Sequence, residues 1–175
     1  STMQHMINGQ NLAFISGRQN KSETIDSFFI SNTITEMKFG ERTRQSYHFP
    51  LYLYPELNDQ ISLLRKSPKP NFQKHIISRI EDCLGLKMSS HKQKNAFLPD
   101  DFFHYLYAIV NSPSYRTTYS ELLKLDFPRI PYPEKTTFWK FVEKGKSLRE
   151  LHLMESPLLD KLITKYPIAG DNTVE

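Results

Sequence analysis

The stretch from Leu98 to Pro133 reads LPDDFFHYLYAIVNSPSYRTTYSELLKLDFPRIPYP, and it decides the fold expected for this chain. Pro99 and the two aspartates after it are typical of a helix start, because proline fits the first turn and acidic side chains are stabilised at the positive end of the helix dipole. Apolar residues then recur at helical spacing, which predicts one buried face made of Phe102, Tyr105, Leu106, Ile109 and Val110.

A second helix and a proline-rich segment follow. Ser112-Pro113 predicts the end of the first helix and the cap of the next one. The second helix is expected to bury Tyr115, Tyr119, Leu122 and Leu123. Three prolines exclude a helix between Phe127 and Pro133, a segment called the proline strap below. Two helices and an extended strap predict a rigid scaffold, and we expect the aromatic side chains of the two helices to form part of its hydrophobic core.

The residues on either side complete the expected fold. Short β-like runs lie at 11–16, 28–31 and 47–54, and Pro50 in the last run indicates an edge strand or a bulge. Asn71 is expected to cap a helix that ends at Gly85, and an amphipathic helix is expected over 135–154. We therefore predict an α+β fold, with an N-terminal strand-rich lobe packed on a C-terminal helical scaffold.

Length and composition limit the possible classes of protein. A chain of 175 residues predicts one domain, and residues 1–6 resemble a cloning remnant, so the domain is expected to be 7–175. The single cysteine, Cys83, excludes an internal disulfide and a multi-cysteine zinc site, and it is consistent with a reducing compartment. Since no apolar run is long enough to span a bilayer and no signal peptide is visible, we expect a cytoplasmic location and no membrane partner.

The net charge of +4 is unevenly distributed. The segment 65–94 contains eight basic and two acidic residues, so it carries +6 and the remainder sums to −2. Such a run is either a solvated face or a surface that contacts phosphates.

Catalytic signatures are absent from the sequence. It contains no phosphate-binding glycine loop of the GxxxxGK[ST] or GxGxxG type, no [ND]PP[YF] motif, and no histidine pair at metal-binding spacing. Asp26, Glu36 and Lys38 imitate the D…ExK pattern of metal-dependent nucleases, in which two carboxylates hold Mg²⁺ and the lysine assists water. The same residues also fit a solvated loop.

Several loops offer the side chains that DNA recognition requires. Bases are read by bidentate donors such as Arg, Gln and Asn, and phosphates are held by cations and hydroxyl groups. The first kind is found in the loop 18–21 and the segment 38–47, where we select Arg18, Gln19, Lys21, Lys38, Arg42 and Arg44. The second kind is found in the basic loop before the central helix, where we select Lys87, Ser89, Ser90, Lys92 and Lys94.

Four motifs occur in an order and spacing that resemble a known family. They are Asn111 to Arg116 (NSPSYR), Asp126 to Pro133 (DFPRIPYP), Phe138-Trp139 and Leu151 to Leu153 (LHL). The run Phe49 to Pro55 (FPLYLYP) and the tail from Tyr166 to Glu175 add to the match. The chain resembles the C-terminal specificity, or target recognition, domain of Type ISP restriction–modification enzymes and their Type IIG relatives.

The resemblance implies a function and a domain context. It implies recognition of a double-stranded DNA sequence, with an N6-adenine methyltransferase domain, its S-adenosylmethionine and any nuclease or translocase placed upstream in the same polypeptide. No cofactor is expected in this fragment, and the resemblance implies a domain truncated at its C-terminus. Individual base contacts are not carried over, because specificity loops vary within the family.

Two other classes of function stay open at this stage. One is a small metal-dependent nuclease that uses Asp26, Glu36 and Lys38. The other is a protein–protein adaptor whose aromatic strap docks a partner.

Overall fold

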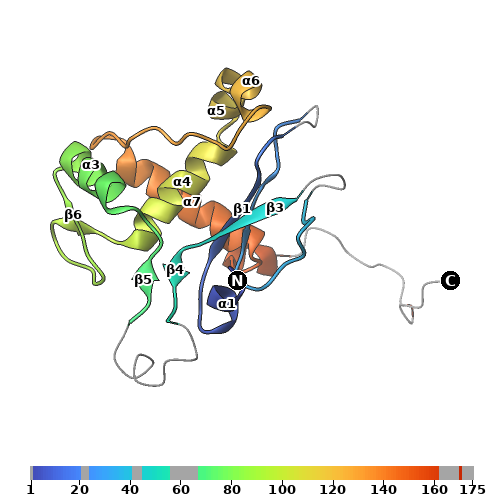
Figure 1. The fold of residues 1–175 in the computed structure, drawn as a ribbon, viewed down its shortest axis with the longest axis horizontal. Helices are drawn as coiled ribbons and strands as arrows, with labels where there is room; N and C mark the ends of the chain where they lie inside the picture. The colour runs from blue at the N-terminus through green and yellow to red at the C-terminus, as the bar shows by residue number, and fades with distance from the viewer. Residues whose placement is uncertain (1, 21–23, 41–44, 56–66, 162–169, 171–175) are drawn as a thin grey trace.

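The computed structural model describes residues 2–20, 24–40, 45–55, 67–161 and 170 (Figure 1). Within them, the fold is α+β as predicted, with antiparallel strands in the first half and helices in the second. Helix α4 (Pro99–Asn111) runs through the middle of the molecule, and α7 (Phe138–His152) crosses it (Figure 1). In the described part of the chain, no helix is long and apolar enough to cross a membrane.

The main sheet has the strand order β2-β1-β3, and both pairings are antiparallel. Its strands are β1 (Ala13–Gly17), β2 (Phe28–Ser31) and β3 (Ser46–Pro50). Phe14 lies opposite Ile30 on one side and opposite Phe49 on the other. Because side chains alternate between the faces of a strand, these three residues share one face of the sheet. Pro50 lies at the end of the edge strand β3, which confirms the prediction made from its position.

Helix α4 forms the centre of the core because nearly all of its faces are covered. The predicted stripe is buried at Phe102, Tyr105, Ile109 and Val110, and Leu106 packs against the same apolar cluster. This cluster joins residues of the sheet, including Phe14, to α4 and α7. At the helix start, the carboxylate of Asp101 accepts a hydrogen bond from the backbone N–H of Leu98 (2.8 Å).

The crossing of α4 and α7 requires a glycine. A Cβ placed on Gly145 would lie 1.9 Å from the carbonyl oxygen of His104, so only a residue without a side chain allows this approach. Phe138, at the start of α7, is fully buried, and its ring packs against those of Phe97 and Tyr105. The hydroxyl of Tyr105 donates to the carbonyl oxygen of Pro131 (3.0 Å), which connects the proline strap to the central helix.

The prediction of a single second helix is wrong in part. The chain forms two short helices, α5 (Pro113–Thr118) and α6 (Ser120–Leu123), because the backbone leaves the helical conformation at Tyr119. Tyr115 and Leu123 are buried as expected, whereas Tyr119 and Leu122 are 42% and 58% exposed. The hydroxyl of Ser112 is hydrogen-bonded to that of Ser114 (2.9 Å), and it does not cap the helix.

The region 47–88 also differs from its prediction at two points. The long strand predicted over 47–54 is interrupted at the buried Leu51, so that β4 (Tyr52–Leu53) separates from β3 and pairs with β5 (Lys69–Pro70). Helix α3 (Lys74–Leu84) begins after Gln73, and Asn71 does not cap it. The side-chain amide of Asn71 donates to the carbonyl oxygen of Pro50 (2.9 Å). Gly85 ends α3 in the left-handed conformation, as predicted.

Three further short elements, in addition to β5, were not predicted. Strands β6 (Lys87–Met88) and β7 (Ala96–Phe97) form a parallel pair at the base of the basic loop. Helix α1 (Gln4–Ile7) buries Met6, and the Nδ1 atom of His5 accepts the backbone N–H of Tyr54 (3.1 Å). Residues 4–6 therefore pack on the fold, while the domain boundary at residue 7 stays a prediction. After Ser156 the chain forms a 3-10 helix, η1 (Pro157–Asp160).

Candidate nucleic-acid interface

The loop after β1 is attached to the junction between α6 and the proline strap. The Nε–H of Arg18 donates to Oδ1 of Asp126 (3.1 Å), and both side chains are exposed, at 64% and 49%. The side-chain amide of Gln19 donates to the carbonyl oxygen of Leu125 (3.2 Å), and the backbone N–H of Asn20 donates to that of Leu123 (3.0 Å). Two predicted base-reading residues, Arg18 and Gln19, are therefore held in place by the strap junction. Lys21 lies outside the described residues.

The carboxylate of Asp126 is held in its charged form. Its pKa is lowered, first by a hydrogen bond from the backbone N–H of Phe127 and then by the hydrogen bond from Arg18. A charged carboxylate is a strong hydrogen-bond acceptor, so Arg18 is anchored at its Nε atom.

Lys38 lies at the same end of the sheet as Arg18. It is exposed in a turn that packs through Phe39, whose ring meets that of Phe29 edge to face at 5.3 Å. The backbone N–H of Ser46, which lies opposite Gly17 in the sheet, donates to the carbonyl oxygen of Met37 (2.7 Å). These contacts place Lys38 near the loop that follows β1. Arg42 and Arg44 lie outside the described residues.

The predicted phosphate-binding residues lie at the start of β6 and in the loop between β6 and β7. Lys87 forms an ion pair with Glu81 (2.8 Å), which raises the pKa of Lys87 and lowers that of Glu81. The hydroxyl of Ser89 accepts the backbone N–H of His91 (3.2 Å), while Ser90, Lys92 and Lys94 are exposed. Part of the charge of Lys87 is thus already neutralised, whereas the ammonium groups of Lys92 and Lys94 form no ion pair with a described residue.

The two sets of residues are not brought together. Figure 1 places β6 on one side of α4 and the main sheet, with β1 and β3, on the other. A single duplex that contacts both sets would therefore extend across the face between them.

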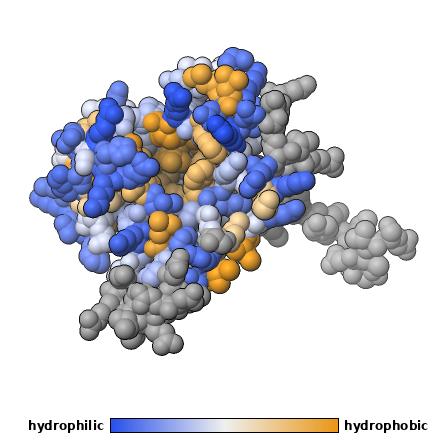
Figure 2. All heavy atoms as spheres, in the orientation of Figure 1, coloured by the Kyte–Doolittle hydropathy of each residue, from blue (hydrophilic) through white to orange (hydrophobic). Residues whose placement is uncertain are grey.

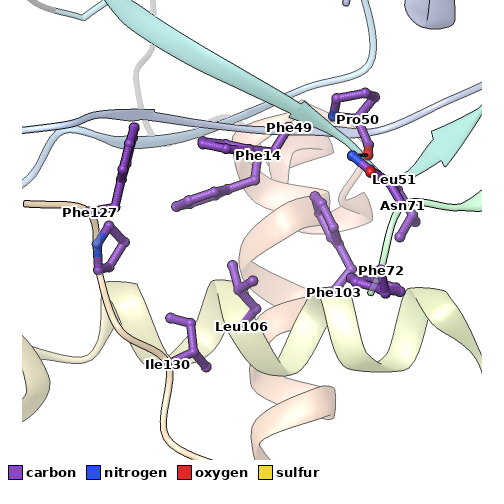
Figure 3. A pocket seen from close by; sticks show the side chains of 11 residues that line it. Phe14, Phe49, Pro50, Leu51, Asn71, Phe72, Phe103, Leu106, Phe127 and Ile130 are labelled. Carbon is purple, nitrogen blue, oxygen red and sulfur yellow. Dashed lines mark hydrogen bonds between the residues drawn. The ribbon is translucent and has the colours of Figure 1, made fainter. Parts of the chain in front are cut away.

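That face contains a cleft that the sequence analysis missed. It has a volume of about 350 Å³ and lies between the sheet and α4 (Figure 3). Its walls include Phe14, Phe49, Phe103, Leu106 and Phe127. Figure 2 shows hydrophobic atoms gathered in this hollow, with hydrophilic atoms around it. One feature of the sequence could have indicated this cleft. Tyr47 and Phe49 are two residues apart, so they share a face of the edge strand, and they are 39% and 40% exposed.

A polar cavity lies on another side of α4. The hydroxyl of Tyr52 donates to the carboxylate of Asp100 (2.6 Å), and burial, followed by this hydrogen bond, raises the pKa of Tyr52. Arg149 forms an ion pair with Glu155 (2.9 Å) in the same cavity. The first contact connects β4 to α4, and the second joins α7 to the residues that follow it.

The described residues contain no cluster of three or more His, Cys, Asp or Glu side chains that could hold a metal ion. Asp26 accepts a hydrogen bond from the hydroxyl of Thr24 (2.8 Å), while Glu36 and Lys38 are exposed in their turn. No observation on these three residues favours the nuclease hypothesis.

One family model matches the chain, and two solved structures share its fold. Residues 1–175 match the model of the Type ISP C-terminal specificity domain. The fold is similar to part of the ATP-dependent Type ISP restriction–modification enzyme LlaBIII bound to DNA (TM-score 0.62, 20% identity over 83% of this chain). It is also similar to part of DrdV in a DrdV–DNA complex (TM-score 0.56, 22% identity over 83% of this chain). This chain spans 8% of the first structure's chain and 12% of the second's. No curated protein matches the sequence.

Proposed function

Because the chain belongs to the family of Type ISP C-terminal specificity domains, we propose that it recognises a specific double-stranded DNA sequence, as the target recognition domain of a bacterial restriction–modification enzyme. The observation that carries this proposal is the family match over residues 1–175. It is supported by the similarity in fold to two proteins described in complex with DNA.

The proposed base contacts are made by the loop that follows β1, which contains Arg18, and by residues near this end of the sheet. An exposed guanidinium and a half-buried side-chain amide, those of Arg18 and Gln19, are the kinds of group that read guanine and adenine in the major groove. Arg18 and Gln19 are held on a loop that is hydrogen-bonded to the scaffold, which reduces the cost of ordering them on the DNA. We assign the same role to Lys21, Lys38, Arg42 and Arg44.

The proposed phosphate contacts are made by the loop between β6 and β7. Lys92 and Lys94 are exposed cations, and Ser89, Ser90 and Lys87 add two hydroxyl groups and one ion-paired ammonium. Such contacts position a protein on the duplex without reading its sequence.

Catalysis is proposed to take place in the rest of the parent polypeptide. We propose that an upstream methyltransferase domain binds S-adenosylmethionine and methylates adenine, and that residues 7–175 contribute recognition only. The enzyme would act in the bacterial cytoplasm, where its DNA substrate is found.

The proposal is tested by selection from a pool of random duplexes with the full-length parent enzyme. Enrichment of one defined sequence is expected, with an affinity at least about 10³-fold above that for random DNA. Equal retention of all duplexes would contradict the proposed function.

A further inference from the structure

The ion pair between Arg18 and Asp126 joins two loops that are far apart in the sequence. Arg18 follows β1, and Asp126 lies between α6 and the proline strap. The contact is made by Nε, one of three nitrogens in the guanidinium group. With the described residues, the Nη1 and Nη2 groups of Arg18 form no hydrogen bond.

This geometry suits recognition of a base. A guanidinium group has five N–H donors in a flat fork, and a guanine presents two acceptors, O6 and N7, in the major groove. A carboxylate bound at Nε holds the plane of the fork and leaves the two terminal nitrogens to face a guanine together. An exposed arginine without such an anchor would lose more conformational freedom on binding.

Asp126 is itself fixed by its neighbours. Its backbone N–H donates to the carbonyl oxygen of Leu122 (3.1 Å), and the neighbouring backbone N–H of Phe127 helps to lower the pKa of its carboxyl group. The ring of Phe127 packs edge to face against those of Tyr47 (5.1 Å) and Phe49 (5.6 Å) on β3. The backbone that carries this carboxylate is therefore fixed to α6 and to the sheet before any DNA is present.

The contact contributes little to the fold, because exposed ion pairs are weak in water. We propose that Asp126 is a positioning residue, which orients the guanidinium of Arg18 toward a base and so helps to set the DNA sequence that the domain prefers. This inference rests on the proposed function. It adds a specificity-determining residue on the strap junction, outside the loops that carry the proposed base contacts.

The test measures base preference at each position of the preferred duplex with the full-length enzyme. Arg18→Ala is expected to reduce discrimination at one base pair by a factor of about 5 to 150, which is the range for one bidentate contact. Asp126→Ala should reduce discrimination at the same base pair and leave the other positions unchanged. The double variant should be no worse than Arg18→Ala alone, because both changes remove one shared contact.

Two further variants separate positioning from folding. Asp126→Asn retains an oxygen that accepts from Nε, so it should recover part of the preference lost in Asp126→Ala. Glu121→Gln is the matched control, since Glu121 forms an exposed ion pair with Lys124 (2.7 Å) on the neighbouring helix. It should leave preference unchanged at every position.

The outcomes distinguish this inference from the function on which it rests. Loss of preference in Arg18→Ala with wild-type preference in Asp126→Ala would overturn the role of Asp126 and leave the proposed function intact. Loss at many positions in Asp126→Ala would show a purely structural role and also overturn it. Unchanged preference in Arg18→Ala would remove Arg18, and therefore Asp126, from recognition. A wild-type enzyme without any sequence preference would overturn the proposed function itself.

Discussion

Phe138 and Trp139 are adjacent residues with opposite environments. Phe138 is fully buried against Phe97 and Tyr105, whereas Trp139 is 46% exposed. Phe138→Ala is expected to lower the free energy of unfolding by about 3–5 kcal/mol, because it removes a buried ring and leaves a cavity. The measurement is urea denaturation of the 175-residue chain.

Trp139→Ala is the matched control for this prediction. It removes a larger side chain that is half exposed, so its effect should be clearly smaller than that of Phe138→Ala. A loss below about 1 kcal/mol for Phe138→Ala would show that this ring does not form part of the core.

His104 makes stability depend on pH. The side chain is 8% exposed, and burial, followed by the charge of Arg149, lowers its pKa from 6.5 to about 4. Between these values the unfolded chain binds a proton that the folded chain does not, so stability from this group is complete above about pH 6.5 and is lost as the pH falls toward 4. The loss is on the order of 3 kcal/mol.

His104→Gln removes this titration and should reduce the acid sensitivity of folding. Urea denaturation at several values between about pH 7 and about pH 4 is the measurement. The carboxylates are unchanged in the variant, so the difference between the two proteins isolates the histidine. Parallel loss of stability in the wild type and the variant would exclude His104 as the cause.

At the scale of elements, the loop between β6 and β7 is expected to act as a unit that holds the DNA backbone. Lys92→Ala and Lys94→Ala should weaken binding to all duplexes alike. Each phosphate contact that is lost should reduce the slope of log affinity against log salt by about 0.9. The measurement is a salt titration of duplex binding by the full-length enzyme, with cognate and random DNA.

Two lysines serve as comparisons for this loop. Lys87 is already paired with Glu81, so Lys87→Ala should change the slope least among the loop residues. Lys144→Ala removes an exposed cation from α7 and should leave the slope unchanged. Loss of affinity for cognate DNA alone would show that the loop reads bases.

At the scale of the whole molecule, local patterns predicted most of the elements. Helix α4 follows from the spacing of Phe102, Tyr105 and Ile109, and the end of α3 follows from Gly85, which adopts the left-handed conformation. The predictions failed where long-range contacts decide the structure. Asn71 binds the carbonyl oxygen of Pro50, and a local capping rule cannot foresee this contact.

The sequence predicted which types of residue form the candidate site. Only the structure shows how these residues are arranged in space. An exposed arginine on a loop is visible in the sequence, but its partner Asp126 is 108 residues away. The separation of the Arg18 loop from the basic loop also depends on how the sheet packs on α4. Neither relationship leaves a periodic signal in the sequence, since each arises from packing between elements.

The central proposal is that this chain specifies the DNA sequence that its parent enzyme recognises. The most direct test exchanges residues 7–175 for the corresponding segment of a family member with a different recognition sequence, and then maps the sites that the hybrid full-length enzyme methylates. A hybrid that methylates the donor's sequence is the predicted result. An active hybrid that still methylates the original sequence would show that another part of the enzyme specifies the site.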